Sequence, residues 1–148
     1  MEEIKIRKAK VEDLAKVLDL VKGLAKYENA EDQVHATLED YERSYHDGLI
    51  SIDVAVINEA IVGCTIYYDT FSTWRGKMLY LEDFFVLEAF RRMGIGKLLF
   101  DEFLAESKRR KCSMVKWQVL DWNEPAIKFY EKEGATIEKE WWNVKIIY

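Results

Sequence analysis

Several short segments of the chain carry hydrophobic residues in alternation with polar ones or in unbroken runs, a pattern typical of β-strands. Asn58 and Glu59 separate two of these segments and favour a tight turn. A second turn is expected at residues 74–77, before the most apolar segment. We expect strands at residues 4–7, 50–57, 61–70, 78–86, 114–120, 135–140 and 144–148.

Other segments space their hydrophobic residues three or four positions apart, which predicts amphipathic helices. The first helix covers residues 11–26, and its apolar positions are Val11, Leu14, Leu18, Val21 and Ala25. Thr37, followed by acidic residues, predicts the start of a second helix that runs to about His46. A third helix is expected at residues 98–110.

A fourth helix is predicted between Asn123, which is a good N-cap, and Gly134, which is a natural residue to follow a helix end. Pro125 stands in its first turn, where proline is tolerated. The chain has one proline, no repeat and no low-complexity tract, so we expect one domain over residues 1–148. The order of elements indicates an α/β fold with a mixed, mostly antiparallel sheet and helices on both faces.

The segment between the strand at 78–86 and the third helix holds a pair of glycines, Gly94 and Gly96. A strand, a glycine loop and a helix N-terminus together form a phosphate site, because the loop lets free N–H groups approach an anion. The residues expected to contact a pyrophosphate are Arg91, Arg92, Met93, Gly94, Ile95, Gly96 and Lys97. A plain turn is the alternative, since Leu99 replaces the third glycine of the dinucleotide fingerprint.

The R-x-x-G-x-G pattern at residues 91–96 resembles the acetyl-CoA pyrophosphate loop of the GNAT superfamily of N-acetyltransferases. Residues 121–130 resemble a second segment of the same superfamily, in which an asparagine contacts the cofactor arm and a tyrosine lies near the thioester sulfur. In this chain these residues are Asn123 and Tyr130. Residues 24–28, 79–86 and 122–130 are similar to the spermidine/spermine and thialysine N-acetyltransferase family, and the resemblance runs over nearly the whole chain. It implies acetyl-CoA as co-substrate, a small amine such as a polyamine or diamine as acceptor, and a homodimer. Asn143 departs from the family, which usually has arginine there.

Acetyl transfer to an amine needs a base, an oxyanion donor and an acid for the departing thiolate. Glu82 is expected to take the amine proton through a water, and Tyr130 to protonate the thiolate. Neighbouring strand residues point to opposite faces, so Asp83 shares the site only if the strand bulges, as the resemblance implies. The alternatives are a carboxylate paired with Lys77 or Arg75, and a core role for Tyr130.

The remaining site residues follow from the resemblance alone. Acetyl-CoA would meet the backbone of Phe84 and Val86, together with Asn123 and Ala126. The amine would meet Tyr27, Glu28, Glu82 and Asp83. Thialysine or a related lysine analogue is the alternative acceptor, and a non-catalytic acetyl-CoA-binding module is the alternative function.

The composition limits the kinds of partner and ligand that we expect for this chain. A net charge of −5 argues against nucleic acid and favours cationic ligands. Cys64 and Cys112 stand alone, and His35 and His46 lie in polar surroundings, so we expect neither a disulfide nor a metal site. No apolar run approaches the roughly 20 residues of a membrane span, and the acidic start is unlike a secretory leader. We expect a cytoplasmic protein that does not bind membranes.

Overall fold

The computed structural model describes residues 2–148, which form two compact units divided after Trp117. The first unit holds a sheet of five strands, and their order in the sheet follows their order in the chain. The strands are β1 (Ile4–Lys8), β2 (Ser51–Ile57), β3 (Ala60–Ser72), β4 (Gly76–Val86) and β5 (Met114–Trp117). Neighbours from β1 to β4 pair antiparallel, and β5 pairs parallel to β4. The predicted mixed, mostly antiparallel sheet is confirmed.

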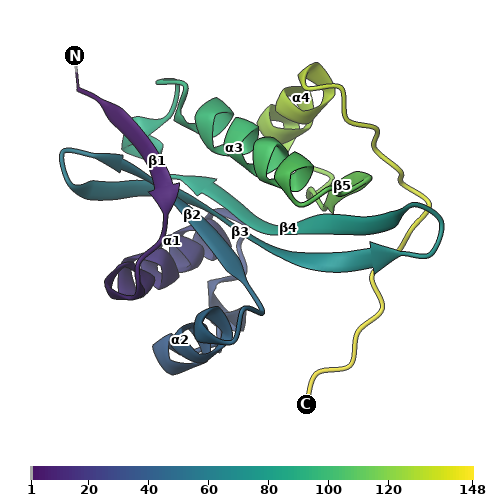
Figure 1. The fold of residues 1–148 in the computed structure, drawn as a ribbon, viewed down its shortest axis with the longest axis horizontal. Coiled ribbons are helices and arrows are strands. Elements are labelled where there is room, and N and C mark those ends of the chain that lie inside the picture. Colours follow the sequence, from purple (N-terminus) through teal and green to yellow (C-terminus); the bar gives the residue numbers. More distant parts are fainter. Residues whose placement is uncertain (1) are drawn as a thin grey trace. The chain divides into compact units, whose positions relative to one another are not determined.

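Helices cover both faces of this sheet, as predicted (Figure 1). The helices α1 (Leu14–Tyr27) and α2 (Leu38–His46) lie on one face, and α3 (Ile95–Arg109) lies on the other. Three short 3-10 helices link these elements, namely η1 (Val11–Asp13), η2 (Glu31–Gln33) and η3 (Glu88–Phe90). The side chain of Thr37 accepts a hydrogen bond from the Asp40 N–H and completes a capping box, so α2 begins where the sequence predicts.

Each face of the sheet has its own apolar cluster. Val17 and Leu20 of α1 pack in the same cluster as Ile52 and Val54 of β2. On the other face, Ile95 and Leu99 of α3 belong to a cluster that contains Ala55, Ile57 and Val62. Strand β2 therefore supplies side chains to both layers, as expected for a strand covered on both sides.

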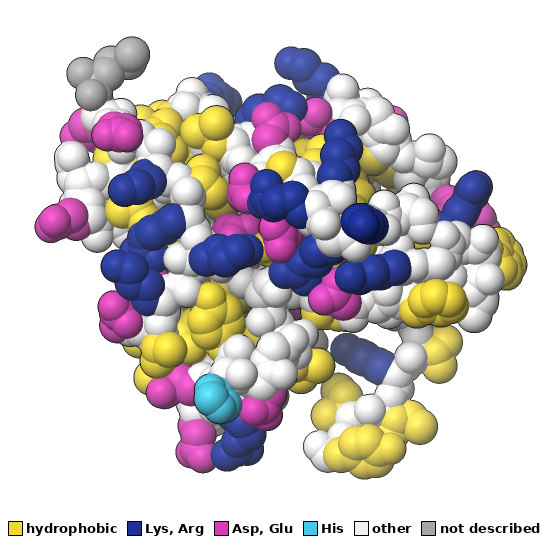
Figure 2. Space-filling model, in the orientation of Figure 1, with side chains coloured by type: hydrophobic (Ala, Val, Ile, Leu, Met, Phe, Trp, Pro, Cys, Tyr) yellow, Lys and Arg dark blue, Asp and Glu magenta, His cyan; other side chains and the backbone are white. Residues whose placement is uncertain are grey.

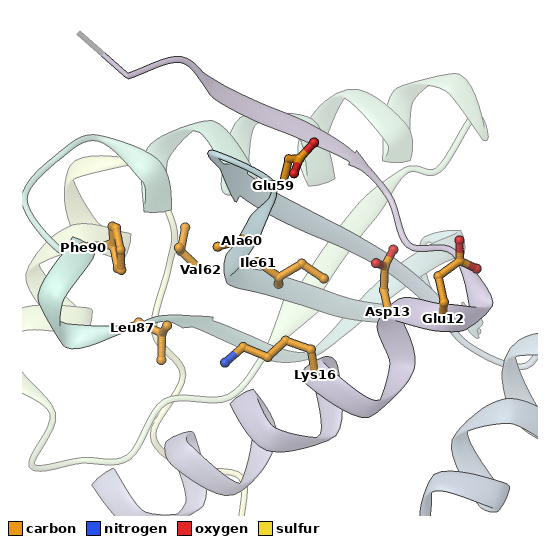
Figure 3. A pocket seen from close by; sticks show the side chains of 9 residues that line it. All are labelled: Glu12, Asp13, Lys16, Glu59, Ala60, Ile61, Val62, Leu87 and Phe90. Carbon is orange, nitrogen blue, oxygen red and sulfur yellow. The ribbon is translucent and has the colours of Figure 1, made fainter.

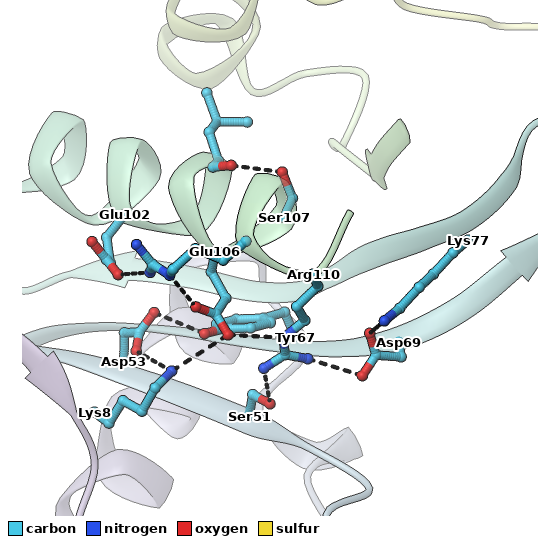
Figure 4. Close-up of polar contacts among 12 residues, drawn as sticks. Lys8, Ser51, Asp53, Tyr67, Asp69, Lys77, Glu102, Glu106, Ser107 and Arg110 are labelled. Carbon is cyan, nitrogen blue, oxygen red and sulfur yellow. Dashed lines mark hydrogen bonds and ion pairs between the residues drawn. The ribbon is translucent and has the colours of Figure 1, made fainter. Parts of the chain in front are cut away.

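A polar cluster joins the C-terminal half of α3 to the sheet (Figure 4). Asp53, only 2% exposed, accepts a hydrogen bond of 3.0 Å from the Tyr67 hydroxyl, and its carboxylate lies 3.9 Å from Lys8 Nζ. Burial raises the pKa of Asp53, and the neighbouring Lys8 charge opposes that rise. Burial also acts to raise the pKa of Glu106, but hydrogen bonds from Arg109 and Arg110 outweigh it and lower that pKa to about 2. These contacts anchor the C-terminal half of α3 to the sheet.

Two predicted boundaries shift. Helix α3 begins at Ile95 rather than at residue 98, so Gly96 and Lys97 lie in its first turn. Strand β5 ends at Trp117 rather than at residue 120, although the apolar run continues. Its ladder with β4 stops at the pair Leu81–Trp117, immediately before an irregularity in β4 that the next subsection describes.

The second unit, residues 118–148, contains one helix among its described residues, α4 (Glu124–Lys132). The side chain of Asn123 caps this helix by accepting a hydrogen bond from the Ala126 N–H at 3.4 Å. Gly134 follows the helix with a φ of +87°, a conformation that favours glycine. The limits of this helix agree closely with the sequence prediction.

The prediction of strands at residues 135–140 and 144–148 is wrong, because these residues form no strand in the structure. Alternation of apolar residues makes a segment suitable for a sheet, but a strand also needs an edge with which to pair. Here the apolar side chains are exposed, with Trp142 at 87% and Val144 at 94% of their full area.

Candidate functional site

The centre of the candidate site is a bulge in β4. Asp83 pairs with Ile66, and the next pair is Leu81 with Tyr67, so Glu82 is an extra residue in β4. A bulge breaks the alternation of side chains and lets two neighbouring residues face the same side. The predicted bulge in this strand is confirmed.

A pocket of about 240 Å³ opens at this bulge, and both carboxylates line it. Strands β3 and β4 form one side, and α2 with its flanking residues forms the other. The lining residues are Ala36, Asp40, Tyr41, Ser44, Ile50, Ile66, Glu82 and Asp83. The volume suits a small ligand rather than a folded partner.

Asp83 is the more buried of the two acids, and its carboxylate makes no hydrogen bond or ion pair with any residue of the described range 2–148. Burial, together with the negative charges of Glu82 and Glu28, raises the pKa of Asp83 to about 7. A buried carboxylate without a positive partner is costly, and a bound cation removes that cost. The electrostatics of the pocket therefore favour a protonated amine.

Glu82 is more exposed, and its carboxylate accepts a hydrogen bond of 3.3 Å from the Tyr68 hydroxyl. Burial and the Glu82 charge raise the pKa of Tyr68 to about 12, which keeps this hydroxyl protonated as the donor. Lys77 pairs instead with Asp69 at 3.8 Å. Within residues 2–148, neither Glu82 nor Asp83 pairs with Lys77 or Arg75, so the ion-pair alternative finds no support.

The end of α1 supplies the two other residues predicted to meet the amine. Tyr27 is the last helical residue and is 39% exposed, and Glu28 caps the helix through its N–H. Burial raises the pKa of Glu28. Glu28 lies close enough to Asp83 for its charge to affect that carboxyl, so three acids act on this part of the fold.

The predicted pyrophosphate loop joins β4 to α3. Arg92 has a φ of +66° and Gly94, the N-cap, a φ of +82°. Left-handed residues within such a turn orient successive N–H groups toward one side, and the first turn of α3 adds further N–H groups. Apart from its two chain neighbours and the backbone of its own helix, no group of residues 2–148 lies within 4 Å of where a Cβ would stand on Gly94. The backbone around this glycine is therefore open to a ligand.

The basic side chains of this loop differ in their contacts. The Arg91 guanidinium lies over the rings of Tyr27 and Phe85, and its Nε donates a 3.0 Å hydrogen bond to the Val86 carbonyl. Lys97 forms an ion pair of 2.8 Å with Asp101, one turn further along α3. Arg92 makes no hydrogen bond or ion pair within the described chain, which leaves its guanidinium available for an anion.

After the bulge, β4 pairs with a neighbouring strand along only one of its two edges. Phe84 pairs with Thr65 and Val86 with Gly63, both on β3, whereas pairing with β5 covers only residues 78–81 of β4. Among the strands of residues 2–148, none pairs with the other edge at residues 82–86. The centroid of the Phe84 ring lies 6.0 Å from that of Phe100 in α3, a stacked contact that helps to hold this segment of β4.

The second unit carries the other predicted residues. Asn123 and Ala126 are joined by the hydrogen bond that caps α4. Tyr130 lies one turn further on, 8% exposed, with its ring 5.6 Å from that of Phe129. The helix thus fixes the relative positions of Asn123, Ala126 and Tyr130 within their own unit.

Residues 15–135 match the model of the acetyltransferase (GNAT) family, which is more than half of the chain. The chain belongs to the GNAT family. It is similar to thialysine N-epsilon-acetyltransferase from Bos taurus, with 32% identity over 152 residues that cover 95% of this chain and 89% of that protein. It is also similar to human spermidine/spermine N(1)-acetyltransferase-like protein 1, with 33% identity over 91% of this chain but only 21% of that protein.

A solved structure supports the fold independently. A mutant of the BH1408 protein from Bacillus halodurans superposes with a TM-score of 0.82, covering 97% of this chain and 99% of that one. The identity between them is 21%, so this likeness concerns the fold alone. The GNAT family uses acetyl-CoA as its co-substrate.

Sequence reasoning missed the part of this GNAT pocket that lies on α2. Asp40 and Tyr41 line the pocket, yet in the sequence they look like a helix-capping acid and an ordinary amphipathic aromatic. Tyr68 was missed as well. The expected bulge was the only feature that could have pointed to Tyr68, because Tyr68 stands two residues along β3 from Ile66, the partner of Asp83.

A larger pocket, of about 380 Å³, lies elsewhere in the first unit (Figure 3). Glu12, Asp13 and Lys16 border it on one side, and Leu87 and Phe90 on another. None of the residues predicted for acetyl transfer lines it. The residues predicted for acetyl transfer therefore line the smaller of these two pockets.

Three further observations concern partners and ligands. Figure 2 shows acidic and basic side chains interspersed over one face of the molecule, in keeping with the modest net charge of −5. Of the helices in residues 2–148, none is both long and apolar enough to cross a membrane. The same residues contain no cluster of three His, Cys, Asp or Glu side chains arranged to hold a metal ion.

Proposed function

We propose that this GNAT protein transfers an acetyl group from acetyl-CoA to a primary amine of a small molecule such as a polyamine or diamine. The observation that carries the proposal is the bulge of β4, which directs Glu82 and Asp83 into one pocket. Asp83 has no positive partner there within the described chain, so a protonated amine is the ligand that its charge favours. The names of the mammalian relatives agree with amine acetylation.

The reaction balances with two protein groups. An alkylammonium has a pKa of about 10 and must lose a proton before its nitrogen can attack. Glu82, the more exposed carboxylate, accepts this proton through a water molecule. The new C–N bond forms at the thioester carbonyl, the nitrogen releases its second proton to water, the C–S bond breaks, and Tyr130 gives its hydroxyl proton to the thiolate of coenzyme A. Tyr130 then regains a proton from solvent.

Acetyl-CoA is proposed to lie along the edge of β4 opposite β3, beyond the end of the ladder with β5. The backbone of Phe84 and Val86 meets the pantetheine amides and the thioester oxygen. The pyrophosphate binds at the start of α3, where residues 91–97 present backbone N–H groups and the Arg92 side chain. Asn123 and Ala126 at the start of α4 contact the pantetheine arm.

Thialysine or another lysine analogue is the second candidate acceptor. The likeness to thialysine N-epsilon-acetyltransferase over 95% of this chain favours it. Such an acceptor carries a carboxylate in addition to its two amino groups, so its fit to the pocket depends on a positive partner for that carboxylate.

We propose that residues 1–148 act together as one N-acetyltransferase domain, and that the protein is a cytoplasmic homodimer. The exposed apolar side chains between Trp141 and Ile147 support an interface, because such a surface is unfavourable in water. Cys64 and Cys112 are both free thiols, which agrees with a reducing compartment.

A thioester-release assay tests the function. The protein is supplied with acetyl-CoA and, in turn, with spermidine, spermine, putrescine, thialysine and lysine. Release of free thiol that depends on the amine, with the acetylated amine identified by mass spectrometry, is the expected result. Binding of acetyl-CoA without release for any of these amines would instead identify a non-catalytic binding module.

A further inference from the structure

We propose that Tyr68 is a positioning residue, whose hydroxyl orients the Glu82 carboxylate for proton transfer from the amine. This inference rests on the proposed function and adds a residue that acts through the proposed base. The contact that carries it is a hydrogen bond of 3.3 Å from the Tyr68 hydroxyl to Glu82 Oε1, which joins β3 to β4 at the bulge.

The bulge leaves Glu82 without a residue opposite it in the sheet. On β4, Leu81 pairs with Tyr67 and Asp83 pairs with Ile66. In this register no residue of β3 lies opposite Glu82. In a regular ladder the side chain opposite limits the directions that its partner can take. Glu82 lacks this restraint, and its side chain is exposed and has several rotatable bonds, so a separate contact is needed to hold its carboxylate in one direction.

Tyr68 supplies that contact from a fixed position. It lies opposite Tyr80 in the ladder of β3 with β4, and the two rings stack with their centroids 5.4 Å apart. On its other side β4 is held by β5, where Tyr80 pairs with Lys116. Glu82 stands two residues beyond Tyr80, and a diagonal neighbour at this spacing is within reach of an aromatic side chain. The sheet therefore fixes the ring, and the ring fixes the position of its hydroxyl.

The contact distinguishes Glu82 from its neighbour Asp83. Within the described chain the Tyr68 hydroxyl is the only hydrogen-bond partner of the Glu82 carboxylate, whereas the Asp83 carboxylate has none. Burial and the Glu82 charge raise the pKa of Tyr68 to about 12, so the hydroxyl keeps the proton that it donates. One of the two adjacent acids is thus held in a set direction, and the other is free to turn toward the charge of the amine.

A set direction matters for the proposed base, because proton transfer through a water needs both ends of the relay in place. The bond to Tyr68 uses Oε1 of Glu82, and Oε2 makes no hydrogen bond within residues 2–148, so Oε2 remains for the water. A base must lie within about 2.6–3.2 Å of the atom whose proton it takes. A misplacement of about 1 Å can lower the rate by about 10²-fold. Loss of the Tyr68 hydroxyl should therefore slow the chemical step without weakening the binding of either substrate.

Tyr68→Phe tests this role, because it removes the hydroxyl and keeps the ring on Tyr80. The acceptor is the amine, among spermidine, spermine, putrescine, thialysine and lysine, that the unchanged protein acetylates fastest. We expect kcat to fall at least about fivefold, while KM for the amine and the affinity for acetyl-CoA change less than about twofold. Unchanged kcat, with or without a higher KM, would overturn the proposal and leave the acetyltransferase function intact. Absence of thiol release by the unchanged protein with every amine would instead contradict the proposed function.

A double-mutant cycle with Glu82→Gln separates positioning from a general effect on the fold. If the hydroxyl acts through the carboxylate, Tyr68→Phe should change kcat less than about twofold in the Glu82→Gln background, because the base that it positions is already lost. An equal fractional loss of kcat in both backgrounds would mean that Tyr68 affects the reaction independently of Glu82, and would overturn the proposal.

Tyr80→Phe is the matched control. It removes a hydroxyl from the other ring of the same stack, and that hydroxyl makes no hydrogen bond within the described chain. The kcat and KM of Tyr80→Phe should equal those of the unchanged protein. A loss of kcat as large as that of Tyr68→Phe would assign the effect to the stacked pair rather than to the bond with Glu82, and would contradict the proposal.

Discussion

The guanidinium carbon of Arg91 lies 5.2 Å from the centroid of the Tyr27 ring. This contact joins the loop proposed to hold pyrophosphate to the end of α1 proposed to hold the amine. The same guanidinium lies 5.5 Å from the Phe85 ring, and its Nε is bonded to the Val86 carbonyl. Arg91 thus contacts residues of both proposed binding regions, and we propose that it positions one relative to the other.

Arg91→Ala should therefore affect both substrates. We expect weaker acetyl-CoA binding and a KM for the amine that rises about threefold or more, because an exposed cation–π contact contributes about 0.5–1 kcal/mol. Arg92→Ala is the control, since Arg92 has no contact with Tyr27, and it should weaken acetyl-CoA binding alone. Steady-state kinetics with each substrate varied separately distinguishes the two. An unchanged amine KM in Arg91→Ala would reduce Arg91 to a phosphate ligand.

Asp83 should make the stability of the protein fall as pH rises. Its pKa is about 7 in the folded protein and near the ordinary 3.8 when unfolded. Between these values the folded state keeps a proton that the unfolded state has lost, so the free energy of unfolding decreases as pH rises through this window. It stays lower above about pH 7.

The variant Asp83→Asn removes this dependence. Its Tm should exceed that of the unchanged protein by at least about 3 °C at pH 8, equivalent to about 1 kcal/mol for a domain of this size. The two melting temperatures should converge at about pH 3 and below, where the carboxyl is mostly protonated in both states. A cationic amine should also stabilise the unchanged protein more than the variant at pH 8. If the Tm of the unchanged protein and that of Asp83→Asn ran parallel from pH 4 to pH 8, the claim that the Asp83 carboxylate is unpaired would be refuted.

Gly96 should matter for the cofactor rather than for the fold. A Cβ at this position would meet the Phe84 ring at 3.5 Å, which is an ordinary contact. Gly96→Val should therefore fold, but its branched side chain would block the approach of pyrophosphate to the start of α3. We expect acetyl-CoA affinity to fall at least tenfold, or about 1.4 kcal/mol. Calorimetry that finds unchanged affinity in a folded Gly96→Val protein would remove this loop from the binding site.

The sequence predicted those parts of the fold that depend on local chemistry. Thr37 and Asn123 cap helices where expected, and Gly134 follows one, because capping uses atoms a few residues apart. The bulge at Glu82 came from a family resemblance, since the pattern of β4 alone would place Glu82 and Asp83 on opposite faces.

Features that depend on distant partners were not predictable in this way. The contribution of Asp40 and Tyr41 to the pocket requires α2 to lie beside the bulge of β4, more than 40 positions further along the chain. The expected strands at residues 135–140 and 144–148 failed for the same reason. Alternation identified the side chains, but nothing in the sequence indicated an edge with which they would pair.

The exposed tail should mediate self-association. Trp141 and Trp142 are 68% and 87% exposed, so we expect a two-fold symmetric dimer whose interface covers them. Light scattering at micromolar concentration should give twice the 17.5 kDa mass of the chain. Trp142→Glu should shift this mass toward the monomer, whereas Trp74→Glu, at an equally exposed tryptophan of the β3–β4 turn, should not. A mass of one chain for the unchanged protein would contradict the dimer.

Tyr130→Phe tests the proposed acid, because it removes one oxygen and keeps the ring beside Phe129. Acetyl-CoA affinity should remain nearly unchanged, while turnover falls by roughly 10²-fold, a typical contribution of a general acid. Glu82→Gln should also lower turnover, but its rate should keep rising with pH toward the amine pKa of about 10, since the reaction then depends on free amine. The Tyr130→Phe profile should lack that continued rise. Undiminished turnover in Tyr130→Phe would make solvent the proton source and leave Tyr130 a packing residue.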